Sequence, residues 1–216
     1  MNLYRLERKL GKFALPNFMF YIVATQLAVY LINMLVPNLG IYNWLYLSRD
    51  ALLRGEIWRL VSFIFLPPMQ SPVFVIFSLY FYYLIGSSLE NNWGTFRFQF
   101  YYMIGMVGAI VSALLTGYAS NLYLNYSLFF AFAMLFPNHQ VLLFFFIPIK
   151  IKYLALLDAA FFLLNFISGS IPIKAAIIFS LINFFLFFWN DLRRSIKNQY
   201  SLYKHRKNYR NFNNRF

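Results

Sequence analysis

Six long apolar stretches alternate with short polar, proline- or glycine-rich interruptions along this chain of 216 residues. A helix needs about 20 predominantly apolar residues to cross the hydrocarbon core of a bilayer, with a range of about 17–25. The pattern therefore predicts an all-α polytopic membrane protein with six transmembrane helices, at about residues 16–36, 72–89, 98–118, 121–136, 153–168 and 173–189.

Two further apolar stretches are too short to cross a bilayer. Residues 57–66 stop at Pro67-Pro68, and residues 141–149 are interrupted by Pro148. We expect the first to lie in the membrane interface, because a Trp beside an Arg is typical of the headgroup level. We expect the second to form a re-entrant or packed loop on the cytoplasmic side.

Composition and charge support a membrane protein and suggest its orientation. The chain is 61% hydrophobic and 23% aromatic, more than a soluble domain of this size could bury. Of its 19 Lys and Arg residues, four lie in residues 1–15 and eight in residues 193–216. Because basic residues favour the cytoplasmic side, both termini should be cytoplasmic, which requires an even number of spans. The net charge of +13 thus has a membrane explanation, and we expect no nucleic-acid partner.

The same distribution divides the chain into three parts. Residues 1–15 place leucines on one face of a helix and cations on the other, which predicts an amphipathic helix on the membrane surface. Residues 16–192 form the six-helix membrane domain. Residues 193–216 are basic and aromatic without a core of their own, which predicts a disordered cytoplasmic tail.

Four short motifs in order resemble the rhomboid superfamily. They are Trp58-Arg59, Gly86-Ser87-Ser88-Leu89-Glu90, Gly94-Thr95-Phe96-Arg97-Phe98 and Leu135-Phe136-Pro137-Asn138, and the resemblance covers roughly residues 50–190. It implies a rhomboid-like helical bundle. Six of these residues should mainly hold the fold and secondarily contact a client: Trp58, Arg59, Gly86, Glu90, Gly94 and Arg97. For Glu90 we expect Arg97 or a nearby backbone N–H as partner.

The Ser–His dyad of rhomboid proteases is not found. The family serine precedes the fourth helix in Gly-x-Ser-Gly, but that motif is absent and Leu122 falls near its position. The two histidines, His139 and His205, both lie outside the sixth span, where the family histidine belongs. Ser78 also replaces the family's Asn in the second span. We therefore expect no catalytic residues and a resemblance to the inactive, derlin-like members; a Ser127–Lys174 hydrolase is an alternative.

Polar residues inside the spans are the remaining candidate sites. They are Ser78, Asn125, Ser127, Asp158, Asn165 and Asn183. Ser78, Asn125 and Ser127 could hydrogen-bond an unstable client helix, and Asp158 could pair with Lys152 or Lys150. Ion or solute transport through Asp158 is the alternative function. The scattered His, Asp and Glu residues predict no metal site, and we expect no cofactor.

The sequence as a whole favours a non-proteolytic, rhomboid-like membrane protein. We expect it to bind transmembrane segments or lipid and to assist the handling of membrane proteins. Its partners would be membrane lipids and transmembrane client proteins, in an oligomeric state that the sequence does not define. The compact loops favour the bacterial plasma membrane.

Overall fold

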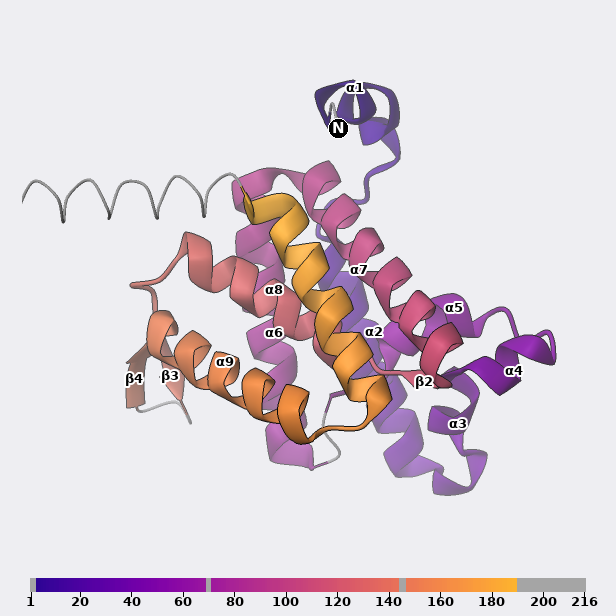
Figure 1. Ribbon diagram of the computed structural model, residues 1–216. Coiled ribbons are helices and arrows are strands. Elements are labelled where there is room, and N and C mark those ends of the chain that lie inside the picture. The colour runs from indigo at the N-terminus through magenta and orange to yellow at the C-terminus, as the bar shows by residue number, and fades with distance from the viewer. Residues whose placement is uncertain (1–2, 69–70, 144–146, 190–216) are drawn as a thin grey trace, which may run out of the picture.

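The computed structural model describes residues 3–68, 71–143 and 147–189 and is mainly helical (Figure 1). The predicted N-terminal segment contains helix α1, Leu3–Leu10, and the 3-10 turn η1, Gly11–Phe13. The long helices are α2 (Phe18–Leu35), α6 (Pro72–Trp93), α7 (Thr95–Thr116), α8 (Leu122–Leu135), α9 (Ile151–Ser168) and a last helix, Ile171–Trp189. The predicted tail, residues 193–216, lies outside the described residues.

Five segments are helical, long and apolar enough to cross a membrane. They are Glu7–Leu35, Pro72–Trp93, Thr95–Thr116, Ile151–Ser168 and Ile171–Trp189. The chain is therefore a helical, multi-pass membrane protein, as the hydrophobic pattern predicts. The expected fourth span is the exception, because α8 has only 14 residues and measures about 21 Å at 1.5 Å per residue.

Helix α8 lies at the centre of the bundle. Eight of its 14 residues are buried, among them Leu128, Phe129 and Phe132. It packs on α6, α7 and α9, whose inward faces contribute further large side chains such as Tyr101 and Phe162. The aromatic residues pack edge-to-face, as between Phe130 and Phe162 at 5.1 Å, a geometry that aromatic quadrupoles favour.

A folded loop connects α2 to α6. It contains η2 (Pro37–Leu39), α3 (Ile41–Leu45), strand β1 (Leu47–Ser48), α4 (Arg49–Leu53), α5 (Arg59–Ser62) and η3 (Phe63–Phe65). Strand β1 pairs antiparallel with β2, Tyr118–Ala119, in the connection from α7 to α8. Leu47 and Ala119 face each other in this pair and are both buried, so the loop is anchored to the bundle.

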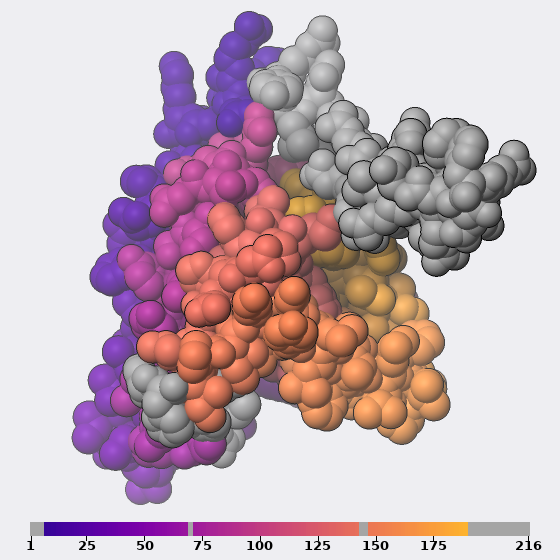
Figure 2. Space-filling model, turned by 90° about the vertical axis from the view of Figure 1, so that its left-hand side faces the viewer, coloured from indigo at the N-terminus to yellow at the C-terminus, as the bar shows by residue number. Residues whose placement is uncertain are grey.

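The connection from α8 to α9 differs from the expectation. It is an antiparallel β hairpin, β3 (Gln140–Leu143) with β4 (Ile147–Lys150), where the sequence predicts no regular structure. Pro148 is tolerated because each strand of a two-stranded hairpin has a free edge that needs no N–H donor. The hairpin continues directly into α9, and both lie at the front of the molecule in Figure 2.

Helix α9 and the last helix form a V. They meet at the short turn Gly169–Ser170, and Figure 1 shows α9 running obliquely away from the last helix toward the hairpin. Only 11% of the apolar window of α9 is buried, against 28–33% in the other four segments. Helix α9 is therefore the least packed of the five long helices and has the most surface left for lipid or a partner.

Candidate functional site

Arg59 fixes the loop between α2 and α6. Its guanidinium donates hydrogen bonds to the carbonyl oxygens of Asn43 and Tyr46, both at 2.6 Å, and to the Glu56 carboxylate at 2.7 Å. The side chain is 8% exposed, and its donors point into a turn whose backbone oxygens would otherwise lack partners. The hydrogen bond from Arg59 is the main reason that the pKa of Glu56 lies below its ordinary value. Arg59 thus acts on the loop backbone and is positioned to hold the fold.

Trp58 lies on the surface of the same loop. Its indole N–H donates to the Trp44 carbonyl oxygen at 3.2 Å, and the two indole rings are stacked with centroids 6.5 Å apart. Both rings are exposed, which suits an amphipathic side chain at a membrane interface.

Glu90 joins the second long helix to the start of α2. Its carboxylate accepts a hydrogen bond at 2.9 Å from the backbone N–H of Asn17, the residue before α2. The expectation of a backbone N–H donor is correct, but the donor is 73 residues away rather than nearby. The prediction that Arg97 is the partner of Glu90 is wrong. Arg97 instead pairs with Glu7, with Nη2 and Oε2 3.0 Å apart, and so ties α7 to α1.

Two glycines of the motifs lie where a side chain would clash or would strain the backbone. Gly86 faces Met19 on α2, and a Cβ at this position would overlap the methionine side chain. Gly94 is the single residue between α6 and α7 and has φ +87°, a conformation that favours glycine. Close approach of α2 to α6 and a sharp reversal between α6 and α7 therefore both depend on a missing side chain.

Ser127 and Asn183 meet inside the bundle. Asn183 Nδ2 on the last helix lies 3.4 Å from Ser127 Oγ on α8, and the Tyr101 hydroxyl from α7 bonds to the same Oγ. Tyr101 also donates to the Ser127 carbonyl oxygen at 3.0 Å. Ser127 is fully buried, and its hydroxyl is held by a phenol and an amide, neither of which is a general base.

Lys174 lies at a different level from Ser127. It is nine residues before Asn183, the residue of the last helix that bonds Ser127, which corresponds to about 13 Å along the helix axis. The Ser120 hydroxyl also has a hydrogen-bond partner, because it accepts a hydrogen bond from the Leu122 N–H at 3.2 Å. His139 follows α8 in a turn and packs against Phe132, and His205 lies outside the described residues.

Asn125 belongs to a second buried polar group. It is buried close to Tyr82 on α6, and its Nδ2 has no hydrogen-bond partner among the described residues. Ser78, one turn before Tyr82 on α6, is half-buried. The polar residues of this region thus lie between α6 and α8 at the centre of the bundle.

Sequence reasoning missed several buried polar residues. Gln26 Nε2 on α2 donates to the Ile64 carbonyl oxygen, and Asn121 Nδ2 donates to the carbonyl oxygens of Ile64 and Leu66. Both amides close the turn at η3, where the chain leaves regular helix. A glutamine in the middle of the first apolar stretch was the available signal for this contact.

Asp158 and Asn165 lie two turns apart on α9 and therefore on the same face. Asp158 is half-buried and close enough to Tyr126 and Tyr82 to interact with both electrostatically; Asn165 is exposed. None of the ion pairs between described residues includes Asp158, so the expected pairing with Lys150 or Lys152 is wrong. Lys152 instead lies over the Tyr153 ring at 5.1 Å.

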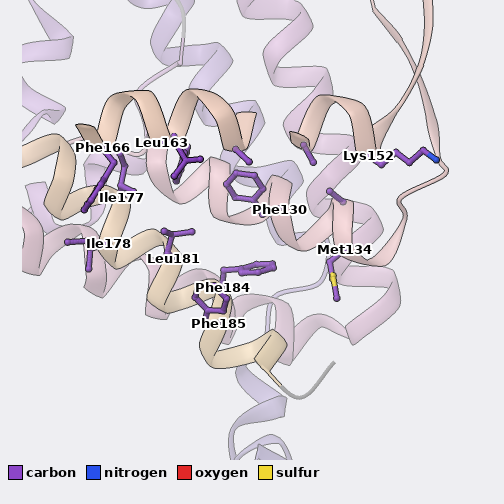
Figure 3. Close-up of a pocket in the computed structure, with 14 residues that line it drawn as sticks. Phe130, Met134, Lys152, Leu163, Phe166, Ile177, Ile178, Leu181, Phe184 and Phe185 are labelled. Carbon is purple, nitrogen blue, oxygen red and sulfur yellow. The ribbon is translucent and has the colours of Figure 1, made fainter. Parts of the chain in front are cut away.

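A large cavity fills the V between α9 and the last helix, with α8 behind it; we call it the wedge cavity (Figure 3). Its volume is about 710 Å³. Of the 14 described residues that line it, 13 are apolar and the other is Lys152. Phe166 and Ile177 lie at its narrow end, and Lys152 and Phe185 at its wide end.

No protein-family model matches the chain, and no curated protein matches it.

Proposed function

We propose that this protein is a six-span, rhomboid-like membrane protein without protease activity that binds membrane-spanning helices of other proteins. On this proposal α8 is the fourth span along the chain and brings the five longer segments to a total of six. A helix of about 21 Å suffices there because α8 is enclosed by other helices and meets little lipid. The resemblance to the rhomboid superfamily implies that its motif residues hold the fold. The contacts of Arg59, Glu90 and the two motif glycines support this part of the proposal.

The observation that carries client binding is the polar face of α9. Asn165 is exposed and Asp158 is half-exposed on the least packed helix, between residues that face lipid. Hydrocarbon cannot satisfy an amide or a carboxyl group, so intramembrane polar groups usually meet another protein segment or a water-filled path. A second transmembrane helix with a polar residue at this depth would supply the missing partner.

The absence of protease activity rests on the environment of Ser127. Tyr101 and Asn183 occupy the hydroxyl, and neither could accept its proton at neutral pH. The Ser–Lys alternative gains no support, because Lys174 is about two and a half turns away along the last helix. Client helices would therefore be held and passed on, which is the assistance in membrane-protein handling that the resemblance implies.

Both termini belong on the cytoplasmic side in this proposal. Six spans bring the chain back to its starting side, and α1 with its exposed Lys9 and Lys12 lies at that side. The folded loop with Trp58 then lies on the opposite side of the membrane. A bacterial plasma membrane is the setting that we propose.

The test measures binding of a designed helix in liposomes. The full-length protein and an Ala/Leu host helix with a central Asn are reconstituted together, and association is followed by resonance energy transfer between fluorophores. Asp158 and Asn165 are about 10 Å apart along α9, so the single Asn of the host helix can bond only one of them. The Asp158→Leu/Asn165→Leu variant should therefore lose about three- to fivefold in affinity, the effect of one intramembrane hydrogen bond of about 0.6–1 kcal/mol.

A matched control uses the neighbouring stripe of the same helix. Leu157 and Leu164 are exposed and have the same seven-residue spacing, so Leu157→Ala/Leu164→Ala should leave binding unchanged. Energy transfer no greater than between the host helix and an unrelated membrane protein would overturn the proposed function. An equal loss of affinity in both double variants would show that client binding does not depend on the polar groups of α9.

A further inference from the structure

The wedge cavity is an amphipathic site. Its lining is apolar from the turn between α9 and the last helix up to the wide end, where Lys152 is the one charged residue among the described residues of the lining. Its volume of about 710 Å³ falls within the usual range of 300–1,000 Å³ for sites of small organic ligands. A ligand that matches it has a hydrophobic body and an anionic group at one end.

The cavity can be reached from the lipid phase. Several of its lining side chains, among them Leu163, Phe166 and Ile178, are 41–65% exposed and form its outer rim. Others, such as Phe162 and Ile177, are buried and form its floor against α8. A molecule that diffuses in the bilayer could therefore enter sideways between α9 and the last helix.

The wide end lies where charged headgroups are found. It is formed by the start of α9, the end of α8 near Met134 and the end part of the last helix near Phe185 (Figure 3). In the proposed topology all three ends lie toward the cytoplasm. Lys152 extends from this end away from the cavity, as expected of a lysine whose stem lies along apolar surface and whose ammonium reaches the headgroup level.

We propose that the wedge cavity holds one anionic phospholipid of the cytoplasmic leaflet, with its acyl chains between α9 and the last helix and its phosphate at the Lys152 ammonium. The anionic lipid is favoured over a second protein helix by charge: a basic group at the wide end attracts the negative surface of that leaflet. The positive end of the α9 dipole lies beside Lys152 and adds to this attraction. The lipid would also fill the space between α9 and the last helix.

The test compares lipid retention by the full-length protein in native mass spectrometry. The protein is exchanged into micelles that contain equal amounts of phosphatidylglycerol and phosphatidylcholine. Wild type should retain one phosphatidylglycerol with about a fivefold preference, the effect expected of one Lys near an anionic surface. Lys152→Gln should remove the preference, and Ala159→Phe, which adds bulk inside the cavity, should reduce retention of both lipids.

Two controls separate this site from general effects of charge and bulk. Lys174→Gln removes a lysine from the beginning of the last helix, and Leu157→Phe adds bulk on an exposed position of α9 outside the lining. Both should retain lipid as wild type does. Equal retention of the two lipids by wild type, or a preference that survives Lys152→Gln, would overturn the proposal.

A second measurement does not depend on any variant. A phosphatidylglycerol with a photoreactive group near the end of one acyl chain should crosslink the wild-type protein at the narrow end, near Phe166 or Ile177. Crosslinks spread evenly over the outer surface of the bundle would mean ordinary annular lipid and contradict a built site. In a separate experiment, a photoreactive amino acid at Ile177 that crosslinks to a second protein chain rather than to lipid would identify a helix as the occupant instead.

Discussion

The backbone N–H of Asn17 donates a hydrogen bond to the Glu90 carboxylate across 73 residues of sequence, at 2.9 Å. Asn17 has φ +55°, a left-handed conformation that Asn tolerates better than most residues, and this turns its N–H toward α6 just before α2 begins. Glu90 is 7% exposed, so the bond is shielded from water. One carboxylate therefore fixes where the first long helix starts relative to the second.

Replacing Glu90 tests this link. Glu90→Ala should lower the free energy of unfolding by about 1.5–3 kcal/mol, the usual range for a hydrogen bond to a charged group. Glu90→Gln keeps an acceptor oxygen and should cost clearly less. Both are measured by SDS-induced unfolding in mixed micelles; an equal loss in the two variants would mean that the charge, and not the bond to Asn17, matters.

The loop that Arg59 holds should loosen in acid. Because the hydrogen bond from Arg59 lowers the pKa of Glu56, the folded state binds protons less readily than the unfolded chain does. The stabilisation is complete above the ordinary glutamate pKa of 4.5 and is lost as the pH falls through the lowered pKa. Hydrogen exchange of residues 41–59 should therefore accelerate below about pH 4.5.

The matching control removes the titrating group. In Glu56→Gln the amide oxygen still accepts from Arg59 but does not titrate, so exchange in the loop should change less between pH 6 and pH 3.5, apart from the intrinsic chemistry of exchange. Exchange in α7 serves as the internal reference. A wild-type loop that opens no more than the Glu56→Gln loop would contradict the role assigned to this pair.

Gly86 allows α2 and α6 to approach. Gly86→Ala should destabilise the protein by about 1–3 kcal/mol, because the new methyl group overlaps the Met19 side chain. The cost should fall to near zero when the same change is made in a Met19→Ala background, since the obstacle is then gone. A double-mutant cycle with SDS unfolding measures this coupling, and additive costs would show that the two helices do not meet at Gly86.

The long helices could be predicted because lipid imposes a length and a composition on them. The expected helix starts lie within three residues of those in the structure. The β3–β4 hairpin could not be predicted. Its strands are uniformly apolar apart from their ends, without the alternation that distinguishes a half-buried strand.

The polar contacts were harder to predict than the helices. Glu90 and Arg97 are seven residues apart and looked like natural partners, yet each bonds to the N-terminal segment, through Asn17 and Glu7. Pairings of this kind depend on how α1 and α2 pack against α6 and α7, which periodicity does not encode. Ser127 and Asn183 were predicted separately as intramembrane polar residues, but their meeting and the part of Tyr101 required the structure.

The protein should not cleave a transmembrane segment. In liposomes that contain the full-length protein and a reporter helix, no product should form with wild type or with Ser120→Ala, Ser127→Ala or Lys174→Ala. The physical reason is that the Ser127 hydroxyl is held by Tyr101 and Asn183 without a base, and that Lys174 is at another level of the bundle. An active rhomboid protease with the same reporter shows that the assay detects cleavage.

The Ser127→Ala variant separates a structural serine from a catalytic one. Loss of its hydroxyl leaves Tyr101 with the Ser127 carbonyl oxygen as acceptor, so the free energy of unfolding should fall by only about 1 kcal/mol. Binding of the Ala/Leu host helix should not change, since Ser127 is fully buried and distant from the exposed face of α9. Product formation by wild type that Ser127→Ala abolishes would identify Ser127 as a nucleophile. The proposed non-proteolytic function would then be wrong, whatever the stability of the variant.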